Sequence, residues 1–129
     1  MSYDVSAQDT YVQLTKEREL LSKLIKSLQQ YNRKLAKAEQ DYREEFTKKC
    51  LELKVNGYEG DIDGEYINTE PVAWTVTKDL ARGIPEVAEK RMERDSLQGE
   101  VDAIKQKIYQ TKIEIRLLES EMESIQKGE

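Results

Sequence analysis

Two long heptad patterns of apolar residues constrain this chain more than any other feature. In the first, apolar side chains recur at alternating steps of three and four, at Leu21, Leu24, Leu28, Tyr31, Leu35, Ala38 and Tyr42. The second has the same spacing, broken only by Thr111, at Leu97, Val101, Ile104, Ile108, Ile115, Leu118, Met122 and Ile125. Such spacing keeps one stripe of an α-helix facing one partner helix. We therefore expect two long helices that pack along these stripes.

Residues that start or stop helices place the ends of the two helices. A polar lead with Ser6 and Asp9 puts the start of the first helix near residue 8, and Asn56-Gly57 puts its end near residue 55. Pro85 is typical of a first helical position, so the second helix is expected over about residues 85–127. Gly99 lies inside it, either as a tolerated surface glycine or at a close approach of the two helices. Beyond Tyr42 the stripe continues at Phe46, Cys50 and Leu53. The two successive steps of four, from Tyr42 to Phe46 and from Phe46 to Cys50, form a stutter that locally unwinds a supercoil.

The connector between the helices divides into two parts. Over residues 56–70, Asp63-Gly64 is flanked by apolar residues in a glycine-rich, acidic stretch, which predicts a β-hairpin that turns there. Over residues 71–83, Pro71 near the start, apolar steps of four and Gly83 at the end predict a short helix. The only tryptophan, Trp74, is expected to cover the open end of the helix pair.

The charge of the two helices favours their pairing within one chain. Residues 10–54 carry 11 basic and 7 acidic residues, a net +4, whereas residues 85–129 carry 8 basic and 11 acidic residues, a net −3. Folding about the connector keeps both heptads in phase when Leu21 lies near Leu118 and Tyr42 near Leu97. The predicted fold is one all-α domain, a long antiparallel coiled-coil hairpin with a small β-hairpin and a short helix inserted at the connector.

The sequence contains few of the residues that usually carry catalysis. The chain contains no histidine, which removes the commonest general base and the commonest metal ligand. Cys50, the only cysteine, falls in the apolar stripe, so we interpret it as a small core residue rather than a reactive thiol. We expect a protein that is not an enzyme and carries no cofactor.

The acidic connector contains the sharpest local motif, a twelve-residue pattern similar to a calcium-binding loop. Its candidate metal ligands are Glu59, Asp61 and Asp63 at positions 1, 3 and 5 and Glu70 at position 12, with Gly64 at position 6. Position 1 holds the longer glutamate, however, and a proline follows position 12, where the exit helix of such a loop should continue. A solvated acidic hairpin is therefore the preferred interpretation.

Basic residues suggest nucleic acid as an alternative partner. One group clusters on the first helix, and Lys90, Arg91 and Arg94 open the second; the first group consists of Lys23, Lys26, Arg33, Lys34 and Lys37. Phosphate contacts require such charges. The pI of about 5.0 and the lack of a groove-reading motif favour a solvated helix face instead.

A second apolar line on the second helix predicts a partner surface. Tyr109, Ile113 and Leu117 follow one another at steps of four, behind the main stripe. Monomeric proteins usually avoid exposing such a patch, so we expect it, together with Trp74, to be covered by a second copy or by another protein. The remaining possibility is contact with the connector of the same chain.

A further group of residues carries a family resemblance. Several segments resemble small helical proteins encoded in phages and prophages of Gram-positive bacteria: Val72 to Val76, Leu80 to Gly83, Glu86 to Arg91 and Arg94-Asp95, together with the helix pattern from Leu35 to Arg43. Genes for these proteins tend to lie in the early region, near single-strand-annealing recombinases and single-stranded-DNA-binding proteins. The resemblance implies a phage accessory role and supplies no catalytic residues. This chain departs from the pattern in its longer acidic insert over residues 56–70.

Three functional hypotheses follow. The first is a non-enzymatic phage accessory protein that forms an oligomeric coiled coil, a dimer or higher even oligomer, and engages a protein of recombination, replication or host defence. The second is a nucleic-acid-binding recombination accessory protein that uses the basic face of the first helix. The third, by analogy of architecture alone, is a prefoldin-like chaperone subunit.

The expected location is the cytoplasm, which would be that of the host cell if a phage encodes the chain. No apolar run approaches the roughly 18–20 residues that cross a bilayer. Residues 1–5 lack the basic and apolar regions of a signal peptide. A single cysteine also leaves the chain without an internal disulfide.

Overall fold

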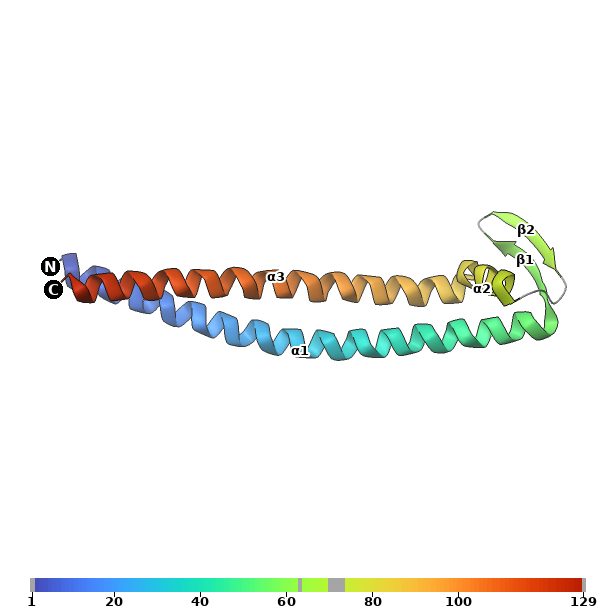
Figure 1. Cartoon of the computed structure of the whole chain (residues 1–129), viewed down its shortest axis with the longest axis horizontal. Helices are drawn as coiled ribbons and strands as arrows, with labels where there is room; N and C mark the ends of the chain where they lie inside the picture. The colour runs from blue at the N-terminus through green and yellow to red at the C-terminus, as the bar shows by residue number, and fades with distance from the viewer. Residues whose placement is uncertain (1, 63, 70–73, 129) are drawn as a thin grey trace. The chain divides into compact units, whose positions relative to one another are not determined.

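The computed structural model describes residues 2–62, 64–69 and 74–128 and is largely α-helical (Figure 1). Its elements are α1 (Ser2–Asn56), β1 (Tyr58–Ile62), β2 (Glu65–Thr69), α2 (Trp74–Gly83) and α3 (Pro85–Lys127). The chain divides into two units: unit 1 comprises residues 1–32 and 100–129, and unit 2 comprises residues 33–99. In each unit a part of α1 packs against a part of α3, so the predicted all-α class with two long packed helices is confirmed.

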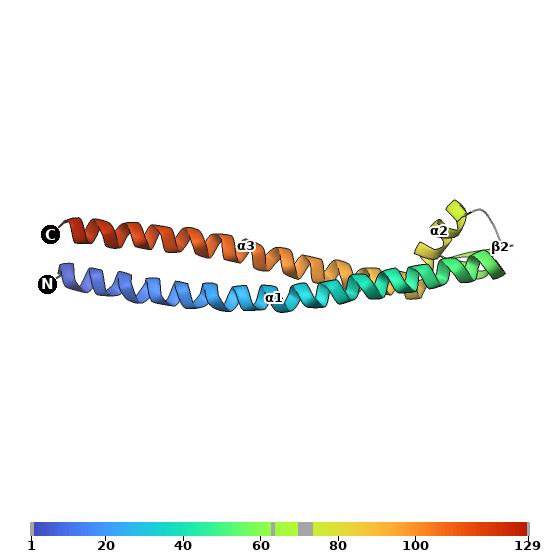
Figure 2. The ribbon, with the colours of Figure 1, turned by 60° about the horizontal axis from the view of Figure 1, so that its bottom comes forward.

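Unit 1 is a pair of helical segments held by a narrow apolar seam. The start of α1 and the end of α3 lie side by side in both ribbon views, so these segments run antiparallel (Figures 1 and 2). Their buried cluster joins residues of both helices: Leu14, Ile115 and Leu118, with Leu21 and Met122 packed against it. Arg18 Nη2 lies 4.0 Å from Glu119 Oε1 at the exposed flank of this seam. Leu21 of α1 thus packs against a cluster that contains Leu118 of α3.

The seam in α1 begins earlier than the heptad pattern indicated. Thr10 and Leu14 are already buried, although the recognisable apolar series starts at Leu21. The helix itself begins at Ser2, so the predicted start near residue 8 was wrong. Residues 2–9 contain neither glycine nor proline, and a helix already nucleated over the seam extends at little cost by adding one backbone hydrogen bond per residue.

Unit 2 has its own apolar cluster, which α2 helps to close. The cluster comprises Cys50, Leu53, Ala81, Ile84 and Val87, with Tyr42, Phe46 and Leu80 packed against it. The rings of Tyr42 and Phe46 stack on each other beside this cluster, with their centroids 6.0 Å apart. The guanidinium of Arg94 on α3 lies 4.6 Å from the Tyr42 centroid, and that of Arg82 on α2 lies 5.9 Å from the Phe46 centroid. Cation–π contacts therefore join α1 to both other helices of the unit.

A two-stranded antiparallel hairpin follows α1. The register pairs Tyr58 with Thr69 at one end of the hairpin and Ile62 with Glu65 at the other. Gly64 has a φ of +82°, a conformation that L side chains rarely adopt. The structure thus has a hairpin over the connector residues for which the sequence predicted one.

Gly99 proves to be a surface glycine of α3. A Cβ built at this position meets no atom within 4 Å, so close packing against a bulky partner is not the reason for the glycine. We expect Gly99→Ala to stabilise the protein by about 0.5–1 kcal/mol, because alanine restricts the unfolded backbone and favours the helix. Thermal melts followed by circular dichroism measure the change. Gly64→Ala, at a positive φ, should lower the melting temperature, and a lower melting temperature for Gly99→Ala would contradict the assignment.

Candidate functional site

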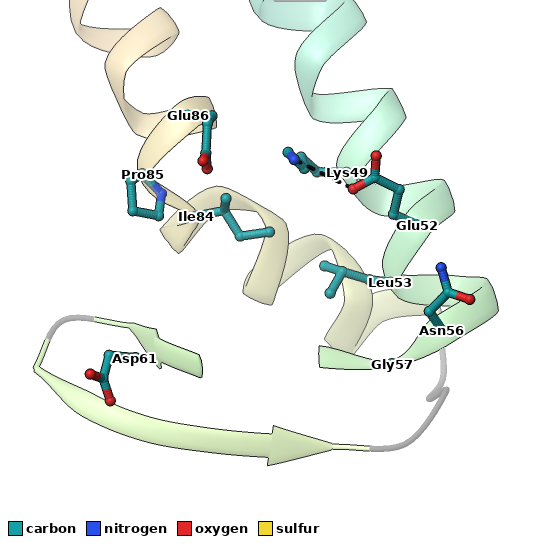
Figure 3. A pocket seen from close by; sticks show the side chains of 9 residues that line it. All are labelled: Lys49, Glu52, Leu53, Asn56, Gly57, Asp61, Ile84, Pro85 and Glu86. Atoms are coloured by element: carbon teal, nitrogen blue, oxygen red, sulfur yellow. Dashed lines mark hydrogen bonds and ion pairs between the residues drawn. The ribbon is translucent and has the colours of Figure 1, made fainter. Parts of the chain in front are cut away.

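A pocket of about 460 Å³ lies in unit 2 between the end of α1, strand β1 and the start of α3 (Figure 3). Helix α1 ends here because Gly57, with a φ of +74°, donates its N–H to the Leu53 carbonyl at 2.9 Å, a glycine cap. Helix α3 begins with Pro85, which needs no hydrogen-bond acceptor at a first helical position. The residues that line the pocket are Lys49, Glu52, Leu53, Asn56, Gly57, Asp61, Ile84, Pro85 and Glu86.

The walls of this pocket carry charges that are largely satisfied within the protein. The Lys49 ammonium lies 3.4 Å from Glu52 Oε2 and 4.0 Å from Glu45 Oε1. Figure 3 shows Lys49 and Glu52 on the α1 wall and Glu86 on the opposite, α3 wall. Its lining contains no serine, threonine, cysteine or histidine; the charged groups there are one lysine and three carboxylates.

The single thiol of the chain is placed for packing. Cys50 is almost fully buried in the apolar cluster of unit 2. Burial raises the pKa of its thiol above the usual value, and the nearby charges of Lys78 and Arg82 offset only part of this effect. At neutral pH the thiol is therefore protonated, and the nucleophilic thiolate is scarce.

We expect Cys50 to react slowly with a disulfide reagent such as DTNB. At pH 8 the native protein should react at least about 100-fold more slowly than the protein in denaturant, because reaction requires local opening of the cluster. A Cys50→Ser, Thr47→Cys double variant is the matched control, since Thr47 is exposed on the same helix. A native rate within a few-fold of this control would contradict the burial of Cys50.

Of the four candidate calcium ligands in the acidic connector, the structure describes two. Glu59 and Asp61 lie on β1 and are exposed, whereas Asp63 and Glu70 lie outside the described residues. The Tyr66 hydroxyl donates a hydrogen bond to Glu59 Oε1 at 2.5 Å, which raises the pKa of Tyr66. Over the described ranges no three His, Cys, Asp or Glu side chains gather as metal ligands would. The side chain of Trp74, at the start of α2, is likewise not described.

The predicted basic residues lie in different surroundings on the two long helices. All five basic residues predicted on α1 are exposed; Lys23 and Lys26 belong to unit 1, and Arg33, Lys34 and Lys37 belong to unit 2. The sequence between Leu20 and Ala38 contains no Asp or Glu. On α3, each of the three basic residues has an acidic neighbour within 4.0 Å: Lys90 with Glu93, Arg91 and Arg94 with Asp95.

The predicted partner surface is exposed in unit 1. We call Tyr109, Ile113 and Leu117 the α3 outer line. The fractional exposures of these side chains are 63%, 38% and 60%, on the face of α3 that points away from the seam residues Ile108, Thr111 and Ile115.

Sequence reasoning missed a second apolar line, on α1 in unit 2. We call Thr47, Leu51 and Val55 the α1 outer line; Leu51 and Val55 are 55% and 72% exposed. A shallow, mostly apolar depression follows it, lined by Arg43, Glu44, Thr47, Lys48, Leu51 and Glu52. The signal was present in the sequence, because these residues recur at steps of four, as the α3 outer line does. Sequence reasoning overlooked the line because the seam residues Cys50 and Leu53 are interspersed among its members in the sequence.

Comparison with known proteins adds no relative. No protein-family model matches the chain, and no curated protein or solved structure matches it significantly. The resemblance to phage-encoded helical proteins therefore stays a prediction. Across the described residues, no helix has an apolar stretch long enough to span a bilayer.

Proposed function

We propose that this chain is a non-enzymatic interaction protein that associates with a second copy of itself through the α3 outer line. The observation that carries the proposal is the exposure of Tyr109, Ile113 and Leu117 on the solvent side of a helix whose seam is already filled. The outer positions of a paired helix are normally polar. Three large apolar side chains in succession there favour a protein contact.

Two-fold symmetry gives this contact a specific form. If the two α3 helices run antiparallel across the axis, Ile113 meets Ile113 of the second copy, and Tyr109 packs on Leu117. Two antiparallel coiled-coil hairpins joined in this way form a four-helix bundle. The aromatic and aliphatic anchors lie at its centre, where interface residues contribute most to binding.

The biological setting that we propose is a phage or prophage accessory role, in which the oligomer engages a protein of recombination, replication or host defence. Only the sequence resemblance supports this setting. A prefoldin-like chaperone role has no specific observation in its favour.

Light scattering coupled to size-exclusion chromatography tests self-association directly. At tens of micromolar we expect a mass of about twice the 15.0 kDa of one chain, or a higher even multiple. The three anchors alone cover much less than the roughly 800 Å² per partner of a standard interface, so the mass should fall on dilution. A mass of one chain at every concentration would overturn the proposal.

Nucleic-acid binding by α1 is the second candidate, and the acid-free run between Leu20 and Ala38 favours it. Phosphate contacts by exposed lysines and arginines release counterions, so such binding must weaken as salt rises. A mobility-shift titration with single- and double-stranded DNA at two salt concentrations measures it. A shift that is absent at low salt would dismiss this candidate.

A further inference from the structure

We infer that the charge pattern of α3 makes the second copy bind in one orientation, antiparallel about Ile113, and makes self-association weaken as ionic strength rises. The inference rests on the proposed self-association and adds the orientation and the regulation of the same contact. Residues 103–112 carry three basic and no acidic residues, a net +3, whereas residues 114–123 carry one basic and four acidic residues, a net −3. The charge of α3 therefore reverses at Ile113, the centre of the α3 outer line.

The charged side chains that flank the α3 outer line are available to a second copy. Three lysines and two glutamates are exposed and form no ion pair or hydrogen bond in the part of the chain that the structure describes: Lys105, Lys107, Lys112, Glu114 and Glu121. Two further glutamates have weak partners, because both members of each pair are more than half exposed: Glu119 with Arg18 at 4.0 Å and Glu123 with Lys127 at 2.9 Å. A second copy can therefore supply counter-charges to both halves.

Helix geometry brings opposite charges together when the second copy is antiparallel. Lys105 and Glu123 are 18 residues apart, which is five helical turns, so they lie on the same flank of the outer line. They lie about 12 Å before and about 15 Å after Ile113 along the helix. A two-fold axis at Ile113 therefore places Lys105 of one copy level with Glu123 of the second copy. On the other flank, Lys107 meets Glu121 in the same way.

A parallel second copy would oppose like charges. In register, the basic halves of the two copies would lie side by side, and so would the acidic halves, at a cost in free energy. Near the axis of the antiparallel pair, Lys112 approaches its own counterpart, but it points sideways from the outer line and extends its ammonium into water. Arg116 lies on the same flank as Tyr109, so an antiparallel copy places it beside that ring as a cation–π pair. The charges thus favour the antiparallel orientation.

Ionic strength should regulate this contact. The flanking pairs are exposed to solvent, where the screening length falls from about 10 Å at 0.1 M salt to about 3 Å at 1 M. Between about 0.05 M and about 0.5 M sodium chloride we expect the dissociation constant of the full chain to rise about ten-fold, as measured by analytical ultracentrifugation. Burial of apolar surface does not weaken as sodium chloride is added, so an unchanged dissociation constant would overturn the inference.

Single cysteines report the orientation. In a Cys50→Ser background, Gln106→Cys and Ser120→Cys each place one thiol at an exposed position seven residues from Ile113, on the face of the outer line. An antiparallel pair brings position 106 level with position 120 of the second copy and holds the two positions 106 about 21 Å apart, far beyond the reach of a disulfide. Mild oxidation should therefore cross-link a mixture of the two variants but not Gln106→Cys alone. Cross-linking of Gln106→Cys with itself, or a dimer in which the mixture gives no cross-link, would overturn the inference.

Charge reversal separates this inference from the proposed self-association itself. Lys105→Glu with Lys107→Glu should raise the dissociation constant about ten-fold or more, and adding Glu121→Lys and Glu123→Lys should restore it, because both halves are then reversed. Damage to the fold would not be rescued in this way, and circular dichroism checks that each variant is helical. A parent with the mass of one chain under all conditions would overturn the self-association and this inference together. A dimer whose affinity is unaffected by the charge reversals would overturn this inference alone.

Discussion

Val87→Asp is expected to unfold unit 2. Val87 is fully buried in the cluster that joins α1, α2 and α3, among Cys50, Leu53, Ala81 and Ile84. An aspartate there would bury an unpaired charge, and the penalty of several kcal/mol is comparable with the whole stability of a small domain, about 5–15 kcal/mol. Circular dichroism should show a much lower melting temperature, and Cys50 should become reactive toward DTNB.

Two further substitutions calibrate this result. Val87→Ala removes only apolar volume and should cost about 2 kcal/mol. Met92→Asp introduces the same charge on the same helix at a side chain that is 72% exposed, so its effect should stay within about 0.5 kcal/mol. A Val87→Asp melting temperature within a few degrees of the parent would show that Val87 does not hold these helices together.

The seam was predictable because its periodicity is a physical requirement of helix pairing. Every apolar residue of the second heptad series is buried or half-buried, from Leu97 to Ile125, and Thr111 is buried among them. A side chain at a seam position is covered whatever its polarity, so the break at Thr111 in the apolar pattern is not a break in packing. The first series is covered along its whole length in the same way.

Features with weaker local signals were not predictable. The extension of α1 to Ser2 depends on backbone hydrogen bonds that add little preference for particular side chains. The cation–π contact of Arg94 with Tyr42 depends on how α3 approaches α1, and the sequence alone suggested that Arg94 was available to phosphate. When a cation and an aromatic ring are distant in the sequence, only the packing of the helices decides whether they meet.

Of the two exposed apolar lines, only one was predictable from the sequence. The sequence identified the α3 outer line because Tyr109, Ile113 and Leu117 stand apart from the seam in an otherwise polar stretch. It did not identify the α1 outer line, because Leu51 and Leu53 are two residues apart and only one of them can face the partner helix. The stutter near Cys50 decides which of the two faces the partner helix: Leu53 is buried and Leu51 is exposed.

Ile113→Glu with Leu117→Glu is expected to convert the self-associated protein into a monomer. In the two-fold arrangement, the glutamates introduced at position 113 of the two copies would face each other across the axis, so two like charges would lie close together in a contact that excludes water. Such juxtapositions cost several kcal/mol, and each 1.4 kcal/mol raises the dissociation constant ten-fold. Light scattering should then report the 15.0 kDa of one chain at concentrations where the parent is a dimer.

The stability of the variant separates an interface effect from unfolding. Both side chains are exposed within one chain, so the helical circular dichroism signal should be retained at low concentration. Met92→Glu is the matched control, because it adds a charge at an exposed apolar residue of the same helix and should leave the mass of the oligomer unchanged. An oligomer that survives the double substitution would move the contact to another surface. The α1 outer line would then be the next surface to test, because Leu51 and Val55 also form an exposed apolar ridge.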